Sequence, residues 1–551
     1  MKHHYSPRWP LLLALVAGVG IVIALAYLPS KPSGAQLPAP GGRYVEGLAG
    51  SPAKINPLFA NFNEVDADLS SLIFAGLVRL GPNGSVQPDM ADLPTIAPDG
   101  RTYVFRLKKG LVWQDGQPIT SRDVIFTVRM LQDPDFNGDP QLVQLFRGVI
   151  VEAFGDEVSV MTLPEPYAPF LARGAVVGIL PEHLLADLDG GQLGDAPFNQ
   201  APVGSGPFRL EQLTPDSALL RRFDRYHRGA PYLDEIELRF YPDDAALLAA
   251  LTSDEIAGAL FRPGLDESAI NAIDNDSQLV RRSLNGTTYS VVYLNKLVPV
   301  FRDDRVRRGL QHGLDRNALI DAVLEGQAVP LDSPIVAGLW SYTGSPDAYA
   351  YDVSLAGTLL DQAGWPLEGD VRQNADGAPL RFRIEASDDP VQVAVAQEIA
   401  TQWGELGAQI EVVVSGASQF VQGVLLPRQF HSALVSIDLG PDPDPYPFWH
   451  SAQAFGQGSN LASFAEETVD ELLENARQTT SAEERASAYR QFQLVFAQLG
   501  VAVLLYSPSY QYVVRSEVQG MSPGLLLTPG ARFRDVQRWY TQTASGSDAG
   551  R

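Results

Sequence analysis

The sequence predicts a mixed α/β protein, because strand-like and helix-like segments alternate along the chain. Residues 380–384 and 409–414 are short apolar runs, and the second is rich in Ile and Val, as buried strands are. Between them, residues 390–406 carry apolar side chains at helical spacing, and Gly407 is suited to end that helix. A strand, a helix and a strand in this order favour parallel pairing. The stripe expected to face inward consists of Ala394, Val395, Ile399 and Trp403.

Other elements are predicted in chain order by local signals. Residues 101–107 alternate polar and apolar side chains, which is typical of a half-buried strand. Thr120 and Asp123 form a capping-box pattern at the start of a helix. Asp315 is suited to cap a further helix that ends at Gly326. The helices expected from these signals span about 120–131, 303–312 and 316–324.

Size and composition exclude several classes of protein. At about 100–200 residues per domain, 551 residues predict two to four domains. A net charge of −24 repels phosphate backbones, so no nucleic acid is expected as a partner. The chain has no cysteine, which excludes disulfides, thiol nucleophiles and an N-terminal lipid-modified cysteine.

The N-terminus has the pattern of an export signal. Lys2 and Arg8 precede an uncharged apolar run over 11–28. A cleaved signal peptide and a retained membrane-anchoring helix are both open, and the flanking residues argue against a buried core helix. With either kind of segment, the rest of the chain is expected to lie outside the cytoplasmic membrane. Residues 29–42 are expected to form a Pro/Gly-rich tether, and 541–551 a disordered tail.

Catalytic and metal-binding signatures are missing from the local sequence. The Ser-centred glycine run at 203–207 lacks the spacing of a nucleophile elbow and predicts a turn entering a strand. Neither a phosphate-binding loop nor a dinucleotide-binding motif occurs after a strand. No two of the seven histidines have metal-ligand spacing, although a site from distant histidines stays open. We therefore expect no catalytic residue, no resident metal and no cofactor.

One polar cluster stands out at 436–450, where Asp438, Asp442 and Asp444 lie within seven residues. One interpretation is the acid–base pair of a glycosidase. For Asp442 and Asp444 the favoured alternative is an Asp-Pro turn, in which the carboxylates cap backbone amides. Asp438 differs because it ends the apolar stretch 433–437, and open α/β sheets bind ligands at strand ends. A single carboxylate there suits a cationic group of a ligand.

These segments together resemble the extracytoplasmic solute-binding proteins of peptide ABC importers, the family of oligopeptide-, dipeptide- and nickel-binding proteins. The resemblance extends over about 43–540, and its specificity lies in the order and spacing of the motifs. They are KINPLF (54–59), IFAGLV (73–78), GRTYVFRLKKGLVWQDGQP (100–118), DVIF (123–126), GSGPF (204–208), YLN (293–295), RVRR (305–308), DQAGW (361–365) and DP (442–443).

The resemblance implies a two-lobed, periplasmic-binding-protein-like (type II) α/β fold in which the ligand lies between the lobes. Hinges are implied near 289–295 and 504–508. The implied divisions are lobe I at 43–284 with an inserted subdomain at about 75–200, lobe II at 285–506, and a return to lobe I at 507–540.

The resemblance also implies a binding protein without enzymatic activity. It would capture a peptide-like solute and deliver it to the permease and ATPase of an ABC importer, acting as a monomer. Asp438 matches the family position that holds the peptide amine, although Pro441 lengthens the turn that follows. Ser436, Ile437, Ile55 and Asn56 match segments that contact the peptide backbone. Trp449 and its neighbour Phe448 either line a side-chain pocket or pack in the core.

Three alternatives remain open on the sequence. In the first, the protein has the same transport role, and its solute is an oligosaccharide, a metal chelate or another small molecule. In the second, it is an exported hydrolase that uses Asp438 with Asp442 or Asp444. In the third, it is a sensor or peptide chaperone with no transporter attached.

Overall fold

The computed structural model describes residues 37–544. The expected export segment at 11–28 and most of the expected tether lie outside these residues. Within the described part of the chain, no helix is long and apolar enough to cross a membrane.

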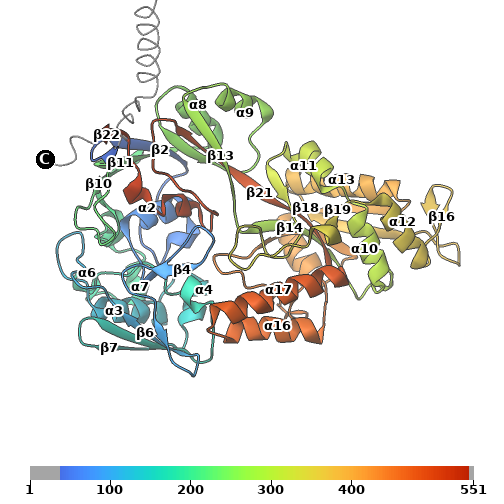
Figure 1. Cartoon of the computed structure of the whole chain (residues 1–551), viewed down its shortest axis with the longest axis horizontal. Helices are drawn as coiled ribbons and strands as arrows, with labels where there is room; N and C mark the ends of the chain where they lie inside the picture. The colour runs from blue at the N-terminus through green and yellow to red at the C-terminus, as the bar shows by residue number, and fades with distance from the viewer. Residues whose placement is uncertain (1–36, 545–551) are drawn as a thin grey trace, which may run out of the picture.

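A twelve-stranded sheet runs through the molecule (Figure 1). Its central strand, β21, spans 14 residues and is paired along its whole length. The strands in spatial order are β19 (Gln409–Ser415), β18 (Arg381–Ser387), β20 (Ser432–Asp438), β14 (Thr288–Leu294), β21 (Ala502–Arg515), β12 (Gly258–Phe261), β2 (Arg43–Ala49), β11 (Glu235–Tyr241), β10 (Ser217–Arg222) and β9 (Phe208–Leu213), with β13 (Leu279–Asn285) and β15 (Ala328–Pro330) also paired to β21.

Two bodies meet at β21. Residues 509–515 pair with β13, and β12 pairs with this half of β21 as well, whereas residues 502–508 pair with β14 and β15. Because β13 continues into β14 after only two residues, the chain crosses between the bodies at 286–287. Figure 1 shows the larger first body on the left and the second body on the right, with β21 passing between them.

The first body contains most of the N-terminal half of the chain. A four-stranded sheet at its far end has the order β5 (Thr95–Ile96), β6 (Thr102–Arg106), β8 (Val158–Thr162) and β7 (Ile150–Phe154). A short hairpin joins β3 (Val78–Leu80) to β4 (Val86–Pro88). The helices are α2 (Glu64–Ile73), α3 (Ser121–Gln132), α4 (Pro140–Phe146), α5 (Phe170–Arg173), α6 (Glu182–Leu185), α7 (Gly190–Leu193), α8 (Asp244–Thr252) and α9 (Glu267–Asp274).

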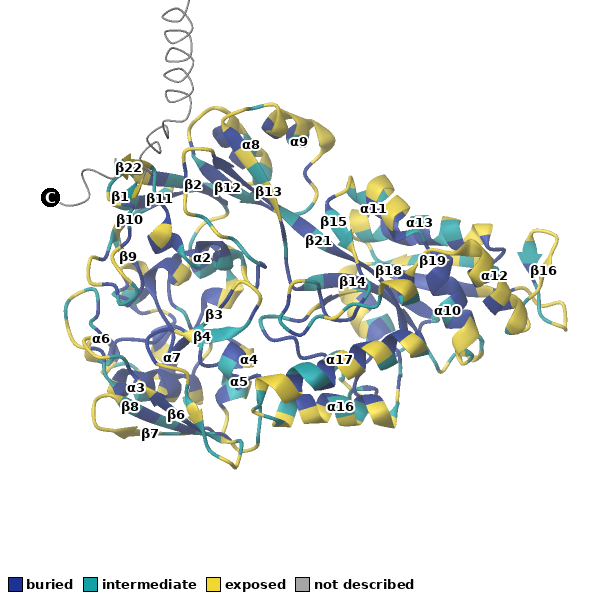
Figure 2. Cartoon of the chain, in the orientation of Figure 1, coloured by how far each residue is buried: buried dark blue, intermediate teal, exposed yellow. Residues whose placement is uncertain are grey.

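The second body packs helices on both faces of its part of the sheet. Tyr289 and Tyr293 of β14 point into one buried cluster, and Val292 points into another, as the two-residue period of a strand requires. Figure 2 shows the strands of this body as largely buried and the outward faces of the surrounding helices as exposed. The helices are α10 (Asp304–His312), α11 (Arg316–Leu324), α12 (Val353–Gln362), α13 (Pro390–Glu405), α14 (Ala417–Gln419), α15 (Tyr446–Trp449), α16 (Glu467–Gln478) and α17 (Ala482–Leu499), beside a hairpin of β16 (Leu367–Glu368) and β17 (Val371–Arg372).

Most elements predicted from local sequence are confirmed. β18, α13 and β19 form the expected unit with parallel strands, and Thr120 with Asp123 forms a capping box at α3. The buried stripe of α13 differs in one position, because Ala396 is buried where Ala394 was expected. The expectation of a disordered tail from residue 541 is wrong for its first residues. β22 (Gln542–Ala544) pairs with β1 (Leu37–Ala39), so backbone hydrogen bonds order both segments.

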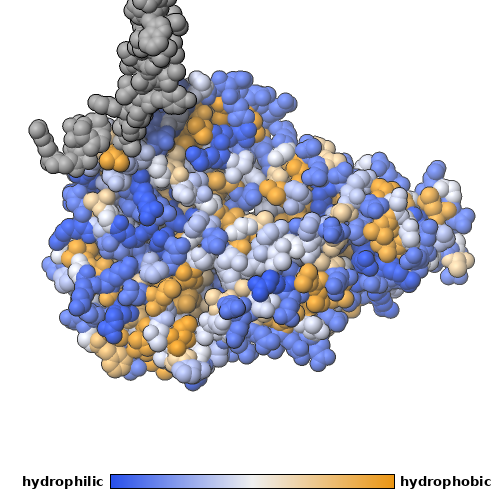
Figure 3. Space-filling model, in the orientation of Figure 1, coloured by the Kyte–Doolittle hydropathy of each residue, from blue (hydrophilic) through white to orange (hydrophobic). Residues whose placement is uncertain are grey.

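The face seen in Figure 3 is mainly polar, with small groups of apolar residues between the polar ones. One exception is β7, at the edge of the four-stranded sheet. Its Ile150 and Phe154 are 61% and 60% exposed. β7 is more than 100 residues before Phe261 and Asp438, where the strands β12 and β20 end.

Candidate functional site

The carboxyl ends of the parallel strands in the two bodies point toward each other across β21. In the first body, β12 is parallel to β2 and antiparallel to β21. In the second body, β20 is antiparallel to β14, which is itself antiparallel to β21. β12 and β20 therefore run in opposite directions and end on either side of the crossing. Loops at the carboxyl ends of strands are where open α/β sheets bind ligands.

Asp438 is the last residue of β20 and lies on the second body's side of this crossing. Its Oδ1 accepts hydrogen bonds from Thr287 Oγ1 (2.6 Å) and from the backbone N–H of Gly440 (2.9 Å). The residue is exposed, and its Oδ2 has no hydrogen-bond partner in the described part of the chain. Two donors on one oxygen hold the carboxylate in place and leave the other oxygen to accept from a ligand.

Ser436 lies two residues before Asp438, on the same face of β20. Gln392, near the start of α13, donates from Nε2 to Ser436 Oγ (3.3 Å), and the hydroxyl of Ser290 lies 3.4 Å from the same atom. Gln392 Oε1 is buried without a partner among residues 37–544. Polar side chains from β14, β20 and α13 thus extend from the carboxylate along one face of the sheet.

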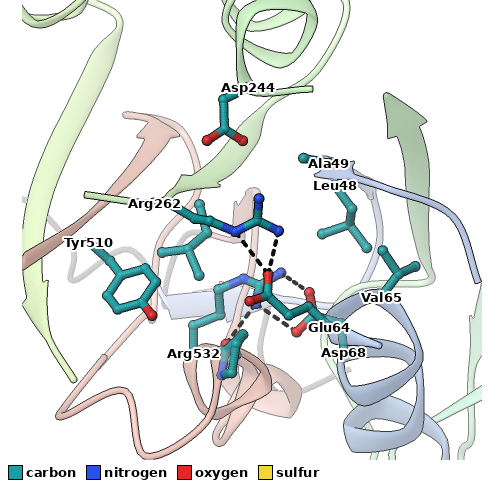
Figure 4. Close-up of a pocket in the computed structure, with 11 residues that line it drawn as sticks. Leu48, Ala49, Glu64, Val65, Asp68, Asp244, Arg262, Tyr510 and Arg532 are labelled. Atoms are coloured by element: carbon teal, nitrogen blue, oxygen red, sulfur yellow. Dashed lines mark hydrogen bonds and ion pairs between the residues drawn. The ribbon is translucent and has the colours of Figure 1, made fainter. Parts of the chain in front are cut away.

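The first body's side of the crossing is built from Glu64 at the start of α2 and Arg262, the residue after β12 (Figure 4). Arg262 donates from Nε (3.3 Å) and Nη2 (2.8 Å) to a single oxygen of Glu64, Oε2. Both side chains are about half exposed, at 54% and 52%. Together with Asp244 and Tyr510, they border a cavity of about 30 Å³, which has room for one water molecule.

Tyr510 connects the two sides of the site. Burial raises the pKa of its hydroxyl. The charges of Glu64 and Asp438 raise the pKa further, and Arg262 lowers it. Charged groups from both bodies therefore lie around this one ring, which sits in β21 just after the crossing.

Beneath the cavity, a buried ionic network joins segments far apart in the sequence. Arg532 donates from Nε to Glu46 Oε1 (2.6 Å) and from both terminal nitrogens to Asp68 (2.8 and 2.6 Å). Tyr44 and Tyr512 donate to Glu46 Oε2 (2.6 and 2.9 Å). Burial raises the pKa of Asp68, and Arg532 opposes that shift. The network fastens the C-terminal segment to β2 and α2.

Asp442 and Asp444 are bound to arginines and do not face Asp438 as partners. Asp442 receives two hydrogen bonds from Arg485 of α17 (3.1 and 2.8 Å), and Asp444 receives them from Arg477 of α16. Both carboxylates are buried. The predicted capping of a backbone amide is confirmed for Asp444, which accepts from the N–H of Tyr446 (3.3 Å). It is wrong for Asp442, whose side-chain hydrogen bonds come from Arg485. Both carboxylates are therefore paired inside the protein.

The other residues predicted to bind ligand have buried side chains. Ile55 is fully buried, and Asn56 donates to Asn199 Oδ1 (3.0 Å) while accepting from the N–H of Leu58 (3.0 Å). Ile437 is buried in the second body. Trp449 packs between Tyr293 and Phe496, with ring centroids 5.2 and 4.7 Å away, which is the core-packing alternative. The side chains of these four residues are therefore used inside the protein.

Beyond the strands that join them, the two bodies also touch elsewhere. The backbone N–H of Ala168 in the first body donates to the carbonyl of Arg477 in the second (2.7 Å). Arg173 donates to the carbonyl of Leu439 (3.3 Å), one residue after Asp438. The guanidinium of Arg477 also lies 5.5 Å from the ring of Tyr167. Both ends of the region between the bodies are therefore bridged.

Sequence reasoning missed Thr287, Gln392, Glu64 and Arg262. Their partners lie 44 to 198 residues away, so no local motif marks them. Among residues 37–544, no three His, Asp or Glu side chains are grouped as a metal site would require.

Two α/β bodies that share one long strand, with strand ends facing each other across it, are the arrangement of a two-lobed binding protein. The chain belongs to the bacterial extracellular solute-binding proteins, family 5, whose model matches residues 85–459. It is 31% identical to Protein XP55 of Streptomyces lividans, over 87% of this chain and 86% of that protein. It is 24% identical to the oligopeptide-binding protein AppA of Bacillus subtilis, over 91% and 92%.

Solved structures have the same fold. The structure of Bacillus subtilis AppA in complex with a nonapeptide superposes with a TM-score of 0.64, at 23% identity, over 91% of this chain and 99% of that one. HbpA2 from Haemophilus parasuis superposes with a TM-score of 0.76, at 22% identity, over 88% and 97%. The mixed α/β fold expected from the sequence is thus confirmed.

Proposed function

We propose that this protein captures a peptide-like solute between its two bodies and delivers it to an ABC importer, without chemistry of its own. The observation that carries the proposal is Asp438, which is oriented by Thr287 and Gly440 and has one oxygen free between the bodies. The relatives named for peptide binding support the same class of solute.

The first body would act as lobe I (43–284 and 507–540, with an inserted subdomain at about 75–200) and the second as lobe II (285–506). Residues 286–287 and 507–508 would form the hinge, since 286–287 join β13 to β14 and the partner of β21 changes from β15 to β13 directly after Pro508. Closure about this hinge removes ligand charges from water, which is costly unless each charge is paired. The free oxygen of Asp438 would pair the ligand's ammonium, and exposed backbone near Ser436 would hold the peptide chain.

The test is native mass spectrometry of the full-length protein purified from its own host, combined with small-angle scattering. We expect a set of short-peptide masses to be released, and the radius of gyration to fall when such peptides are added back. Release of a single sugar or metal chelate would show that this molecule, and not a peptide, is the solute. Turnover of a peptide or glycoside that Asp438→Asn abolishes would show that the protein is a hydrolase and not a binding protein.

We further propose that the protein works outside the cytoplasmic membrane, as a monomer, and that the apolar run at 11–28 anchors it there in place of a cysteine-linked lipid. The expected result is that the full-length protein fractionates with membranes and dissociates from them only in detergent. A soluble exported form that begins near Tyr27 would show that the segment is a cleaved signal peptide.

A further inference from the structure

An open groove of about 580 Å³ at the β9 edge of the large sheet is lined by four arginines. Three of them stand in one row across four neighbouring strands, where directly opposite residues share a face of the sheet. The row consists of Arg209 of β9, Arg221 of β10, Glu235 of β11 and Arg43 of β2. It faces solvent, because the adjacent residues in the same strands are buried, namely Phe208, Leu220, Ile236 and Tyr44.

The positive charges of this row are incompletely paired within the protein. Arg209 forms no ion pair among residues 37–544, and the residue directly opposite it is Arg221. Arg221 lies 3.6 Å from Glu211 and 3.5 Å from Glu235, which is longer than the about 2.7–2.9 Å of a charge-assisted hydrogen bond. Like charges that lie directly opposite each other in a sheet repel. An anion placed between Arg209 and Arg221 would remove this repulsion.

The other acidic residues of the groove do not neutralise this pair. Asp224 and Asp234 are bound by Arg222, at 2.9 and 3.0 Å. The lining as a whole has four arginines and three carboxylates, a balance of +1, in a protein of net charge −24. An anionic surface repels a protein of that charge and attracts it only through such a local patch. The groove would therefore determine which face of the protein can approach an anionic surface.

The groove lies beside the point at which the N-terminal segment joins the first body. After β1, which pairs with β22, the N–H of Gly41 donates to the carbonyl of Tyr232 (2.8 Å), and the carbonyl of Gly42 accepts from the N–H of Asp234 (3.0 Å). Figure 1 shows β22 beside β10 and β11. Residues 29–36 alone separate β1 from the apolar run at 11–28, and eight residues span at most about 28 Å. A membrane that holds this run is therefore close to the groove.

Resting on the anchoring proposed above, we infer that the groove binds the phosphate of anionic lipid headgroups in the membrane to which residues 11–28 attach. The phosphate lies between Arg209 and Arg221, where its charge offsets the repulsion between the two guanidinium groups. Arginine suits this ligand because its planar fork donates two parallel hydrogen bonds to phosphate oxygens. The contact holds the first body against the bilayer surface. The inferred ligand class is phospholipids whose headgroup has a net negative charge.

The test is native mass spectrometry of the full-length protein in neutral detergent, titrated with dioctanoyl phosphatidylglycerol or dioctanoyl phosphatidylcholine. Phosphatidylglycerol is expected to bind more tightly than the zwitterionic lipid. Arg209→Gln and Arg221→Gln should each weaken its binding about fivefold, the usual contribution of one arginine near an anionic lipid surface. Arg381→Gln is the matched control, because Arg381 is an exposed arginine of the second body with a carboxylate at 3.7 Å. It should leave the binding of phosphatidylglycerol unchanged.

Three results would overturn the inference. If both groove variants bind phosphatidylglycerol as tightly as the wild-type protein does, the headgroup binds elsewhere. If the wild-type protein binds both lipids equally, the groove does not select anionic headgroups. If inorganic phosphate in excess displaces phosphatidylglycerol from the wild-type protein, the groove is a site for free anions. Failure of the anchoring itself is seen separately, as the soluble form that begins near Tyr27, and it removes this inference while leaving solute capture intact.

Discussion

Asp438→Asn is expected to weaken the binding of a peptide with a free amine by about 30-fold to several-thousand-fold. Asparagine has nearly the same shape and keeps an oxygen that can accept from Thr287 and Gly440, so the variant removes mainly the charge. Truncating or neutralising one partner of a desolvated charge pair costs about 2–5 kcal/mol, and about 1.4 kcal/mol is a factor of ten. Isothermal titration of trialanine against both proteins measures the difference.

Two controls separate the charge effect from damage to the fold. N-acetyl-trialanine has no ammonium, so wild-type and Asp438→Asn proteins should bind it equally weakly. Asp376→Asn removes an exposed carboxylate from a turn of the same body and should leave trialanine binding unchanged. If wild-type and Asp438→Asn proteins bind trialanine with equal affinity, Asp438 does not bind the ligand.

Arg532→Met is expected to lower the free energy of unfolding by about 3–5 kcal/mol, because it leaves Glu46 and Asp68 buried without a cation. Both carboxylates and the guanidinium are almost wholly buried, so solvent does not screen the loss. Urea unfolding followed by tryptophan fluorescence measures the shift in the midpoint. Arg538→Met, an exposed position in the same segment, should shift it little.

The loss of unfolding free energy in Arg532→Met should also depend on pH. In the wild-type protein burial raises the pKa of Asp68 and Arg532 opposes the shift. Without Arg532 the folded-state pKa of Asp68 rises further above its unfolded value, so the folded variant binds a proton that the unfolded chain releases. Stability of the variant relative to wild type must therefore fall as pH rises from 5 to 8. A destabilisation that is equal at both pH values would show that packing, and not buried charge, accounts for the role of Arg532.

Much of the fold was predictable because its signals are local. The period of apolar residues in α13, the capping box at Thr120 and the Ile- and Val-rich run of β19 are each contained in about 20 residues. Asp438 was predictable for the same reason, since it ends an apolar strand. Side-chain contacts were predicted less well. Asn56 lies in a segment that the family resemblance assigns to ligand, yet its amide is used inside the first body.

The sequence by itself determined the α/β class, the elements with strong periodicity, the family and the one carboxylate at a strand's end. Only the tertiary structure decided which of these charges are paired inside the protein and which keep an oxygen free. Asp442 and Asp444 lie within six residues of Asp438, but arginines from α17 and α16 bind them, whereas Asp438 keeps a free oxygen. Arg262 and Glu64 are 198 residues apart and meet because β12 ends where α2 begins. Ion pairs depend on distance in space, which the order of residues does not contain.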